Sequence, residues 1–303
     1  MLRSLIQKIK FFRFVLAHPL NRANKWAALM RYFRWQFGSR LVTGDVLVPF
    51  VDKTFLRVRP GMTGATGNIY AGLHEFEDMA FVLHLLQEKD LFVDIGANIG
   101  SYTILAGGAV GAQCVSVEPI KSTFHMLEEN INLNRLSGNV QALNMGIGKE
   151  KGVLRFTAGL DTVNHVVADS EQVDSVVEVP IVSLNDLLEN QEPLLIKIDV
   201  EGFETNVIAG ADKVFSKPSL LAVIMELNGS GERYGFDEGP LHEKMLSFGF
   251  QSYTYSPFER QLVSLNGEKS NSGNTLYVRN VDEVASRLSG ARQYRIANAA
   301  RNV

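Results

Sequence analysis

The sequence predicts an α/β protein built on a doubly wound, mostly parallel sheet. From residue 91 onward, short apolar runs typical of buried strands alternate with segments of helical periodicity. Such alternation indicates a parallel sheet, because each crossover helix returns the chain to the same edge. A glycine-containing turn, Gly96 to Gly100, follows the first of these runs. Doubly wound sheets bind ligands at such a turn, outside the carboxyl end of a strand.

The predicted elements follow one another in a regular order. Strands are expected at 91–95, 113–118, 140–143, 194–199, 220–226, 251–255 and 275–278. Helices are expected at 99–109, 122–134, 184–188, 204–209 and 241–248. Two further segments alternate apolar and polar residues, which predicts a hairpin or an insertion at 152–157 and 176–182.

The part of the chain before residue 91 is less regular. Two short strands are expected to pair at 46–51 and 54–58, and the glycine-rich stretch 59–72 is expected to be a loop. A helix is predicted from residue 74 to about residue 87. The acids near its start, Glu75, Glu77 and Asp78, suit the helix dipole, and a functional role for one of them is the alternative.

Composition excludes several classes of protein. The 303 residues are 46% hydrophobic and 21% charged, as in ordinary globular proteins. A single cysteine, Cys114, rules out an intrachain disulfide and a cysteine-based zinc site, and it fits a cytoplasmic location. The apolar runs are shorter than the roughly 18 residues that a transmembrane helix needs.

The charge is distributed unevenly. Residues 1–44 hold nine basic side chains and no acidic one, whereas the remainder holds 21 basic and 33 acidic residues. This first segment is also aromatic, and its apolar residues recur at helical spacing. Its basic residues Lys8, Lys10 and Arg13 interrupt what a cleavable signal would need as an apolar core.

Three interpretations of the basic segment compete. Its helices could pack on the acidic main domain, form an amphipathic anchor at the inner membrane surface, or bind nucleic acid. No recognition motif supports nucleic acid, which is therefore not an expected partner. We predict a basic helical extension over 1–44, a main domain over 45–282, and a helical or disordered tail over 283–303.

The most informative motif surrounds the glycine turn. Gly96 and Gly100 let the backbone approach a ligand closely, and Asn98 tolerates left-handed backbone angles. Asp94 precedes the turn, where it would repel a pyrophosphate but suit a cation. S-adenosylmethionine carries an ammonium and a sulfonium and no phosphate. We therefore expect Asp94, Gly96, Ala97, Asn98 and Gly100 to bind that cofactor.

The next two strand ends extend this prediction. Glu118 lies 22 residues after Gly96, a spacing that suits an acid accepting hydrogen bonds from ribose hydroxyls. Asn144 ends the third strand, where a side-chain amide could meet the adenine edge. Both residues are therefore expected to bind the cofactor.

Four segments resemble the FkbM family of S-adenosylmethionine-dependent methyltransferases: 93–103 (VDIGANIGSYT), 117–119 (VEP), 129–134 (ENINLN) and 197–204 (KIDVEGFE). The resemblance covers about residues 70–280. It implies the class I, Rossmann-like methyltransferase fold, whose seven-stranded sheet has an antiparallel last strand. It also implies O-methylation of a hydroxyl on a saccharide, glycolipid or secondary metabolite, so that the partner is a small-molecule or glycan acceptor.

The segment 197–204 is expected to carry the chemistry. A sugar hydroxyl does not ionise near neutral pH, so the reaction needs a general base whose pKa is raised by burial. Asp199 is the first candidate and Glu201 the second, while an ion pair between Lys197 and Asp199 is the structural alternative. A divalent metal is not expected. If one were bound, its ligands would be Asp199, Glu226 and Asn228.

Two other functions remain open at this point. The chain could be a non-catalytic nucleoside-binding module or a membrane-associated scaffold that uses residues 1–44. An NAD-dependent oxidoreductase is disfavoured, because Asp94 would repel the pyrophosphate and the full three-glycine spacing is missing. The acceptor and the oligomeric state do not follow from the sequence.

Overall fold

The computed structural model describes residues 11–42, 44–159, 164–168, 171–173, 175–271 and 273–303. Its centre is an eight-stranded mixed sheet in the order β12-β11-β13-β10-β9-β3-β4-β5. In chain order, the strands of this sheet are β3 (Leu91–Ile95), β4 (Gln113–Val117), β5 (Val140–Leu143), β9 (Pro193–Ile198), β10 (Ala222–Glu226), β11 (Gln251–Ser256), β12 (Gln261–Ser264) and β13 (Asn274–Val278).

The strand directions confirm the predicted fold class. The five strands β5, β4, β3, β9 and β10 are parallel neighbours. The last strand along the chain, β13, lies between β10 and β11 and is antiparallel to both. This is the doubly wound sheet with an antiparallel last strand. The sheet has one strand more than the seven expected, because β12 pairs with β11 and extends the edge.

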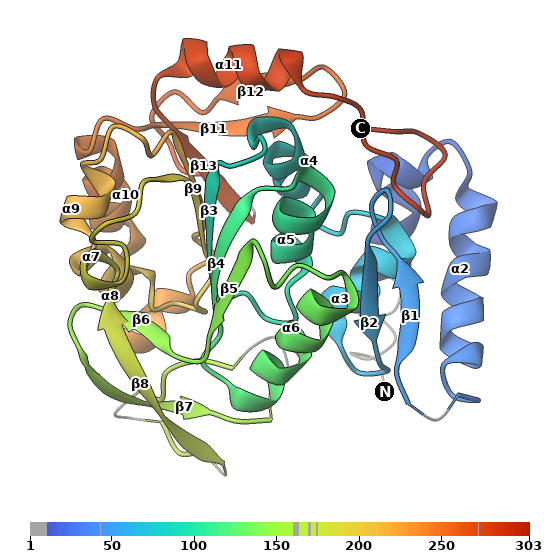
Figure 1. Ribbon diagram of the computed structural model, residues 1–303, viewed down its shortest axis with the longest axis horizontal. Helices are drawn as coiled ribbons and strands as arrows, with labels where there is room; N and C mark the ends of the chain where they lie inside the picture. Colours follow the sequence, from blue (N-terminus) through green and yellow to red (C-terminus); the bar gives the residue numbers. More distant parts are fainter. Residues whose placement is uncertain (1–10, 43, 160–163, 169–170, 174, 272) are drawn as a thin grey trace.

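Helices cover both faces of the sheet (Figure 1). One face carries α4 (Phe76–Leu85), α5 (Ser101–Ile104) and α6 (Lys121–Leu133), and the other carries α7 (Leu184–Leu187), α8 (Glu204–Ala209), α9 (Asp212–Phe215) and α10 (Glu238–Ser247). Side chains alternate between the two faces along each strand, so Phe92 and Leu195 join one core while Val93 and Ile196 join the other. Asp94 and Lys197 lie side by side in the register of β3 and β9.

Most element boundaries agree with the predictions to within a few residues. One difference concerns the helix expected at 99–109. In the structure α5 ends at Ile104 and the chain continues as a π-helical turn, Leu105–Val110. Gly107 and Gly108 lie in this turn, where an added Cβ would approach Val140 and Thr54 to within 3 Å. The glycines therefore permit close packing that a longer side chain would prevent.

A second difference is a correction. The glycine-rich stretch 59–72, expected to be a loop, contains the helix α3 (Thr63–Ala71). Glycines lowered the apparent helix propensity of this stretch, but Ala65, Ile69 and Tyr70 are buried. Burial of these side chains against the rest of the domain outweighs the local preference.

Two small sheets lie beside the central one. The strands β1 (Val46–Pro49) and β2 (Phe55–Val58) form the antiparallel pair that was predicted. The strands β6 (Gly146–Gly148), β7 (Gly152–Thr157) and β8 (Val176–Ser183) form a three-stranded sheet, in which β7 and β8 are antiparallel. The predicted hairpin or insertion is therefore an antiparallel pair with one added strand.

The basic N-terminal segment packs on the domain through its inner face. Residues 11–17 are helical, a 3-10 turn spans Pro19–Asn21, and α2 spans Lys25–Gly38. The Asn21 amide donates to the carbonyl oxygens of Val15 and Tyr70. The helical periodicity of the apolar residues at 2–9 predicts a helix there, but these positions lie outside the described residues. No helix in the described part of the chain is both long and apolar enough to cross a bilayer.

The chain ends close to the β1–β2 pair. The last helix, α11, spans Val281–Gly290. Beyond it, Ile296 forms a β-bridge with Val51, and Tyr294 and Val303 exchange two backbone hydrogen bonds. The domain boundaries proposed above remain predictions.

Candidate cofactor and active site

The glycine turn joins the ends of three parallel strands. The backbone N–H groups of Gly96 and Ala97 both donate to the carbonyl oxygen of Val117, and Asp199 N–H donates to Ile95. Gly96 has a φ of +81°, and an added Cβ would lie 1.8 Å from the carbonyl oxygen of Asp199. Only glycine allows β3 and β9 to end this close together.

Asp94 is buried at the base of this turn. Its side chain is 1% exposed, and one carboxylate oxygen accepts a hydrogen bond from Thr103 Oγ1 at 2.7 Å. The other oxygen, Oδ1, has no hydrogen-bond partner among the described residues. Burial raises the pKa of Asp94, although the nearby Lys197 opposes that shift. A buried carboxylate oxygen without a partner is costly, so this atom marks a place for a donor from a ligand.

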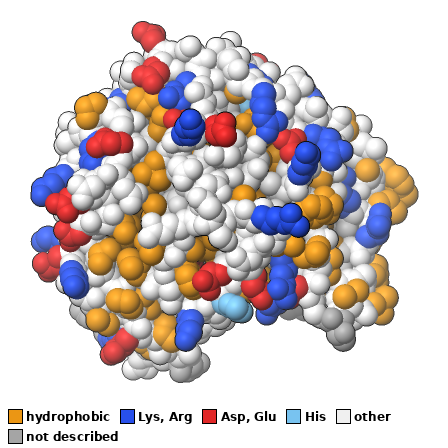
Figure 2. Space-filling view, viewed as in Figure 1, with side chains coloured by type: hydrophobic (Ala, Val, Ile, Leu, Met, Phe, Trp, Pro, Cys, Tyr) orange, Lys and Arg blue, Asp and Glu red, His pale blue; other side chains and the backbone are white. Residues whose placement is uncertain are grey.

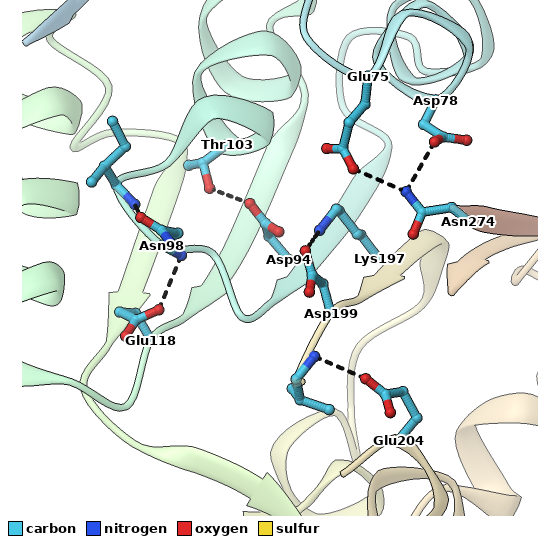
Figure 3. A network of polar contacts seen from close by, with 12 residues as sticks. Glu75, Asp78, Asp94, Asn98, Thr103, Glu118, Lys197, Asp199, Glu204 and Asn274 are labelled. Atoms are coloured by element: carbon cyan, nitrogen blue, oxygen red, sulfur yellow. Dashed lines mark hydrogen bonds and ion pairs between the residues drawn. The ribbon is translucent and has the colours of Figure 1, made fainter. Parts of the chain in front are cut away.

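Glu118 lies at the end of the neighbouring strand and connects two loops. Its Oε2 accepts from the backbone N–H of Asn98 at 3.0 Å (Figure 3). Its Oε1 accepts from the backbone N–H of Ile120 at 3.0 Å. Asn98 has a φ of +51°, as its sequence position suggested. Burial raises the pKa of Glu118 to about 7.

These residues surround a cavity with a volume of about 430 Å³. That volume lies within the range of small-molecule sites. Five of the predicted cofactor residues line it: Asp94, Gly96, Ala97, Asn98 and Glu118. Three acids at or just after the ends of β9 and β10 also line it: Asp199, Glu201 and Glu226. The structure thus brings both predicted halves of the site into one space.

Lys197 is the cation between the two halves. It is 3% exposed, and its Nζ is 2.7 Å from Asp199 Oδ2 and 4.7 Å from the centroid of the Tyr102 ring. Burial disfavours its charge, but the surrounding carboxylates, Asp199 first, raise its pKa above the ordinary value. The ion pair considered from the sequence is therefore present (Figure 3).

Asp199, Glu201 and Glu226 form an acidic cluster. One carboxylate oxygen from each lies within 4.8 Å of the others. Burial, reinforced by the charge of Asp199, raises the pKa of Glu201 to about 7 and that of Glu226 to about 8. Two carboxyl groups that titrate near neutrality at the end of a parallel sheet can accept a proton at physiological pH.

The loop that carries Glu201 is held in an uncommon conformation. Glu201 has a φ of +55° and Gly202 one of +100°. Glu204 is buried, and its Oε1 accepts from the backbone N–H groups of Val200 and Gly202. Non-glycine residues with such angles persist where surrounding bonds over-determine them, often at functional sites.

Three predicted residues lie outside the cavity wall. Gly100 is the N-cap of α5 and has a φ of +93°. An added Cβ would lie 2.5 Å from Leu127, so this glycine allows the turn to pack against α6. The Asn144 amide donates to the carbonyl oxygens of Glu118 and Pro119. Asn228, predicted as the third ligand of an alternative metal site, accepts from Ser230 N–H. The third carboxylate beside Asp199 and Glu226 is that of Glu201, which was predicted as a base and not as a metal ligand.

The sequence reasoning missed part of the cavity wall. Phe11, His74, Glu75 and Tyr102 also line it. Glu75 was attributed to the helix dipole, but its side chain makes no cap bond and instead accepts from Asn274 at 3.2 Å. Asp78 binds the same amide, and its pKa is raised to about 7, by burial first (Figure 3). The sequence signal for this part of the wall was an acid, Glu75, next to a histidine, His74, at the start of a predicted helix.

The residues present fit S-adenosylmethionine. A buried carboxylate oxygen without a partner, on Asp94, suits a cationic group. Glu118 ends the adjacent strand, where an acid can accept from ribose hydroxyls. The turn between them is too crowded for any side chain at Gly96.

Comparison with known proteins identifies a methyltransferase family. The sequence model of the FkbM methyltransferase domain matches residues 94–257, which is more than half of the chain. A protein from Beauveria bassiana named Methyltransferase 1 is 29% identical over an alignment of 161 residues, which covers 45% of this chain and 64% of that protein. The hexuronic acid methyltransferase AglP from Haloferax volcanii is 28% identical over 157 residues, which are 51% of this chain and 62% of that protein.

The chain thus spans a little under two thirds of each of these relatives. Among solved structures, the precorrin-6y C5,15-methyltransferase from Geobacter metallireducens is similar with a TM-score of 0.40 and 13% identity, over 68% of this chain and 88% of that one. That score is too low to bear on activity. The family match rests on the segment that contains the glycine turn and all the acids of the cavity's strand ends. This chain belongs to the FkbM family of S-adenosylmethionine-dependent methyltransferases.

Proposed function

We propose that the protein transfers a methyl group from S-adenosylmethionine to a hydroxyl of a saccharide, glycolipid or secondary metabolite. The observation that carries the proposal is the acidic cluster of Asp199, Glu201 and Glu226 beside the cofactor residues in one cavity. A hydroxyl acceptor needs a group that removes its proton, whereas a more acidic acceptor does not. Carboxyl groups with pKa values near 7 meet that need.

The donor half binds and orients the cofactor. When bound, S-adenosylmethionine supplies an electrophilic methyl group on its sulfonium. Asp94 Oδ1 would accept from its ammonium group, and Glu118 would accept from its ribose hydroxyls. The protein's further contribution is to align the acceptor oxygen with the methyl group, which lowers the entropic part of the barrier.

Among the acidic residues, Glu201 is the best-placed general base. Asp199 Oδ2 lies 2.7 Å from Nζ of the buried Lys197, so an acceptor hydroxyl would have to compete with this ion pair for the carboxylate. Glu201 is partly exposed and has no ion-pair partner among the described residues. In this proposal the Glu201 carboxylate takes the hydroxyl proton. The ion pair between Asp199 and Lys197 positions the loop and sets the electrostatic potential around Glu201.

The acceptor class is proposed from the family and from the relative named a hexuronic acid methyltransferase. A panel of hexuronic acids, neutral hexoses and simple aliphatic alcohols, with labelled S-adenosylmethionine, tests it. We expect label in the saccharides, and sensitivity of the transferred methyl to ether-cleaving rather than ester-hydrolysing conditions. Label that is removed by mild base would indicate a carboxyl ester and would reject hydroxyl methylation.

We propose further that no divalent metal is required. The three carboxylates lie close enough to share an ion, which is the specific observation for the alternative. However, Lys197 already neutralises Asp199, and the raised pKa values of Glu201 and Glu226 leave less negative charge for a metal. Activity that survives exhaustive chelation would support the proposal, whereas activity restored only by added Mg²⁺ would show a metal-dependent enzyme.

A further inference from the structure

Helix α2 has two faces of different character. Its inner face packs on the domain: Ala28 and Trp35 are buried, and Gln36 donates to the Tyr70 hydroxyl. Arg31 also turns inward, where it donates to Asn21 and to the carbonyl oxygen of Tyr70. These contacts fix the helix to α3, and no described residue buries the side chains on its opposite side.

The outer face of α2 is an apolar stripe of four exposed side chains. Trp26, Met30, Phe33 and Phe37 recur at intervals of four, three and four residues, which places them along one side of the helix. Trp26 is 69% exposed and Phe37 is 65% exposed. Single exposed apolar residues are ordinary, but a continuous stripe of aromatic residues marks an interaction surface. We call these four residues the α2 outer face.

Unpaired basic residues flank the α2 outer face. Lys25, Arg34 and Arg40 are exposed, and none has an ion-pair partner in the described part of the chain. The first acid along the chain is Asp45, whose carboxylate is already bound by Arg57 and Arg59. Figure 2 shows hydrophobic and basic side chains interspersed along the edge of the molecule where α2 lies.

We propose that the α2 outer face docks the protein on an anionic lipid bilayer, with α2 lying in the plane of the interface. Aromatic and apolar side chains on one side of a helix, with lysine and arginine beside them, are the features that bind a helix to an anionic membrane surface. The basic residues would attract anionic headgroups while the apolar stripe enters the acyl boundary. This inference is independent of the methyl-transfer chemistry.

Charge selects the bilayer over a second copy of this chain. In a symmetric dimer the same patch meets itself, so the unpaired basic residues of two α2 helices would face each other and repel. A bilayer with anionic headgroups supplies the opposite charge and also accepts the apolar stripe. The stripe runs along one uninterrupted helix of 14 residues, so its side chains can face a single surface.

Docking would also reach the wall of the cavity. Phe11 lines the cavity, and its ring packs 6.0 Å from that of Tyr32 on α2 and 5.4 Å from that of Tyr70 on α3. The helix that would rest on the bilayer is therefore in contact with a residue of the active site. Cofactor binding gives an independent check that surface variants leave this wall intact.

Co-sedimentation of the full chain with vesicles tests the proposal. We expect binding to phosphatidylglycerol-containing vesicles at low salt, weak binding to pure phosphatidylcholine vesicles, and release at high salt. The variant Lys25→Gln/Arg34→Gln/Arg40→Gln should lower partitioning on the order of a hundredfold. The matched control Lys149→Gln/Lys151→Gln/Lys213→Gln removes three exposed charges elsewhere and should sediment like the wild type.

A spectroscopic measurement tests the apolar stripe separately. The chain has two tryptophans, and Trp35 is buried, so the variant Trp35→Phe leaves Trp26 as the only reporter. Its emission should shift to the blue, and be quenched by brominated lipid, when anionic vesicles are added. Trp26→Ser/Phe37→Ser should reduce sedimentation, while Val153→Ser, which alters an exposed valine on β7, should not.

Three results would overturn the proposal. They are equal binding of the wild type and both α2 variants to anionic vesicles, an unchanged Trp26 spectrum in the bound protein, and no binding by protein that still binds S-adenosylhomocysteine. A dimer in light scattering that the α2 variants dissociate, without vesicle binding, would assign the face to a second copy instead. Failure of methyl transfer would leave all of these readouts unaffected.

Discussion

The two halves of the cavity are built differently. In the donor half, Glu118 is buried and holds backbone N–H groups, and Asp94 is fixed by Thr103. In the acceptor half, Glu201 and Glu226 are partly exposed, and their carboxyl groups interact with other charges. On the proposed assignment, donor binding relies on carboxylates fixed by buried hydrogen bonds, whereas acceptor chemistry relies on partly exposed side chains that can change without disturbing the strands.

The largest expected effect is a loss of kcat from a substitution in the acceptor half alone. Glu201→Gln keeps the shape of the side chain and removes the base, so kcat should fall by about 10² to 10⁴. The affinity for S-adenosylhomocysteine, measured by calorimetry, should stay within about twofold of the wild-type value, because that residue lies in the other half of the cavity. Asp199→Asn is the comparison, since it tests the carboxylate already paired with Lys197. A larger loss of kcat in Asp199→Asn than in Glu201→Gln would reverse the assignment.

The second effect is a loss of cofactor affinity from a substitution in the donor half alone. Asp94→Ala removes the carboxylate oxygen proposed to accept from the cofactor's ammonium group, and cofactor affinity should fall on the order of a hundredfold or more. Circular dichroism should show that the fold is retained. Thr103→Val removes the hydrogen bond to Asp94 and serves as a milder control, with a loss of about tenfold. Wild-type affinity in Asp94→Ala would show that the cation binds elsewhere.

The pH dependence sharpens the comparison. A general base acts only when it is deprotonated, and the pKa of Glu201 is raised to about 7. The rate at saturating substrate should therefore rise about tenfold per pH unit below 7 and level off above it. The same slope should be absent in Glu201→Gln. A rate that is flat between pH 5 and about 8 would contradict a base with a raised pKa.

The smallest effect concerns Asn144, which the sequence assigned to adenine. Its amide donates to the carbonyl oxygens of Glu118 and Pro119 and so supports the donor loop from behind. Asn144→Ala should change cofactor affinity by less than about threefold, while the free energy of unfolding should fall by about 1 to 2 kcal/mol. Denaturant unfolding and calorimetry together separate these outcomes. A tenfold loss of cofactor affinity at an unchanged free energy of unfolding would instead support the predicted contact between Asn144 and adenine.

The fold and the donor half could be predicted because local pattern and global position agree there. The apolar runs at 91–95 and 113–118 predict strands, and in a parallel sheet the carboxyl ends of the strands lie at one edge. That rule alone places Asp94 and Glu118 near each other. The glycine at position 96 is required by the approach of Asp199, which lies 103 residues further along the chain. The sequence signals this contact only by the glycine itself.

The acceptor half and the N-terminal wall depend on contacts between distant segments. Nothing in the local sequence shows that Glu75 meets Asn274, or that Phe11 reaches the cavity. Helix α3 was missed for the same reason, because its stability comes from burial rather than from propensity. The order of Asp199 and Glu201 as bases also depended on which carboxylate Lys197 contacts.

Calorimetric titration with S-adenosylhomocysteine tests the central claim most directly, namely that the Asp94–Glu118 half binds this nucleoside. The wild-type protein should bind one molecule per chain, with the same affinity in the presence and absence of Mg²⁺, and Asp94→Ala should bind on the order of a hundredfold more weakly. NAD should not bind. A folded protein that fails to bind S-adenosylhomocysteine, or that binds NAD in its place, would contradict the account.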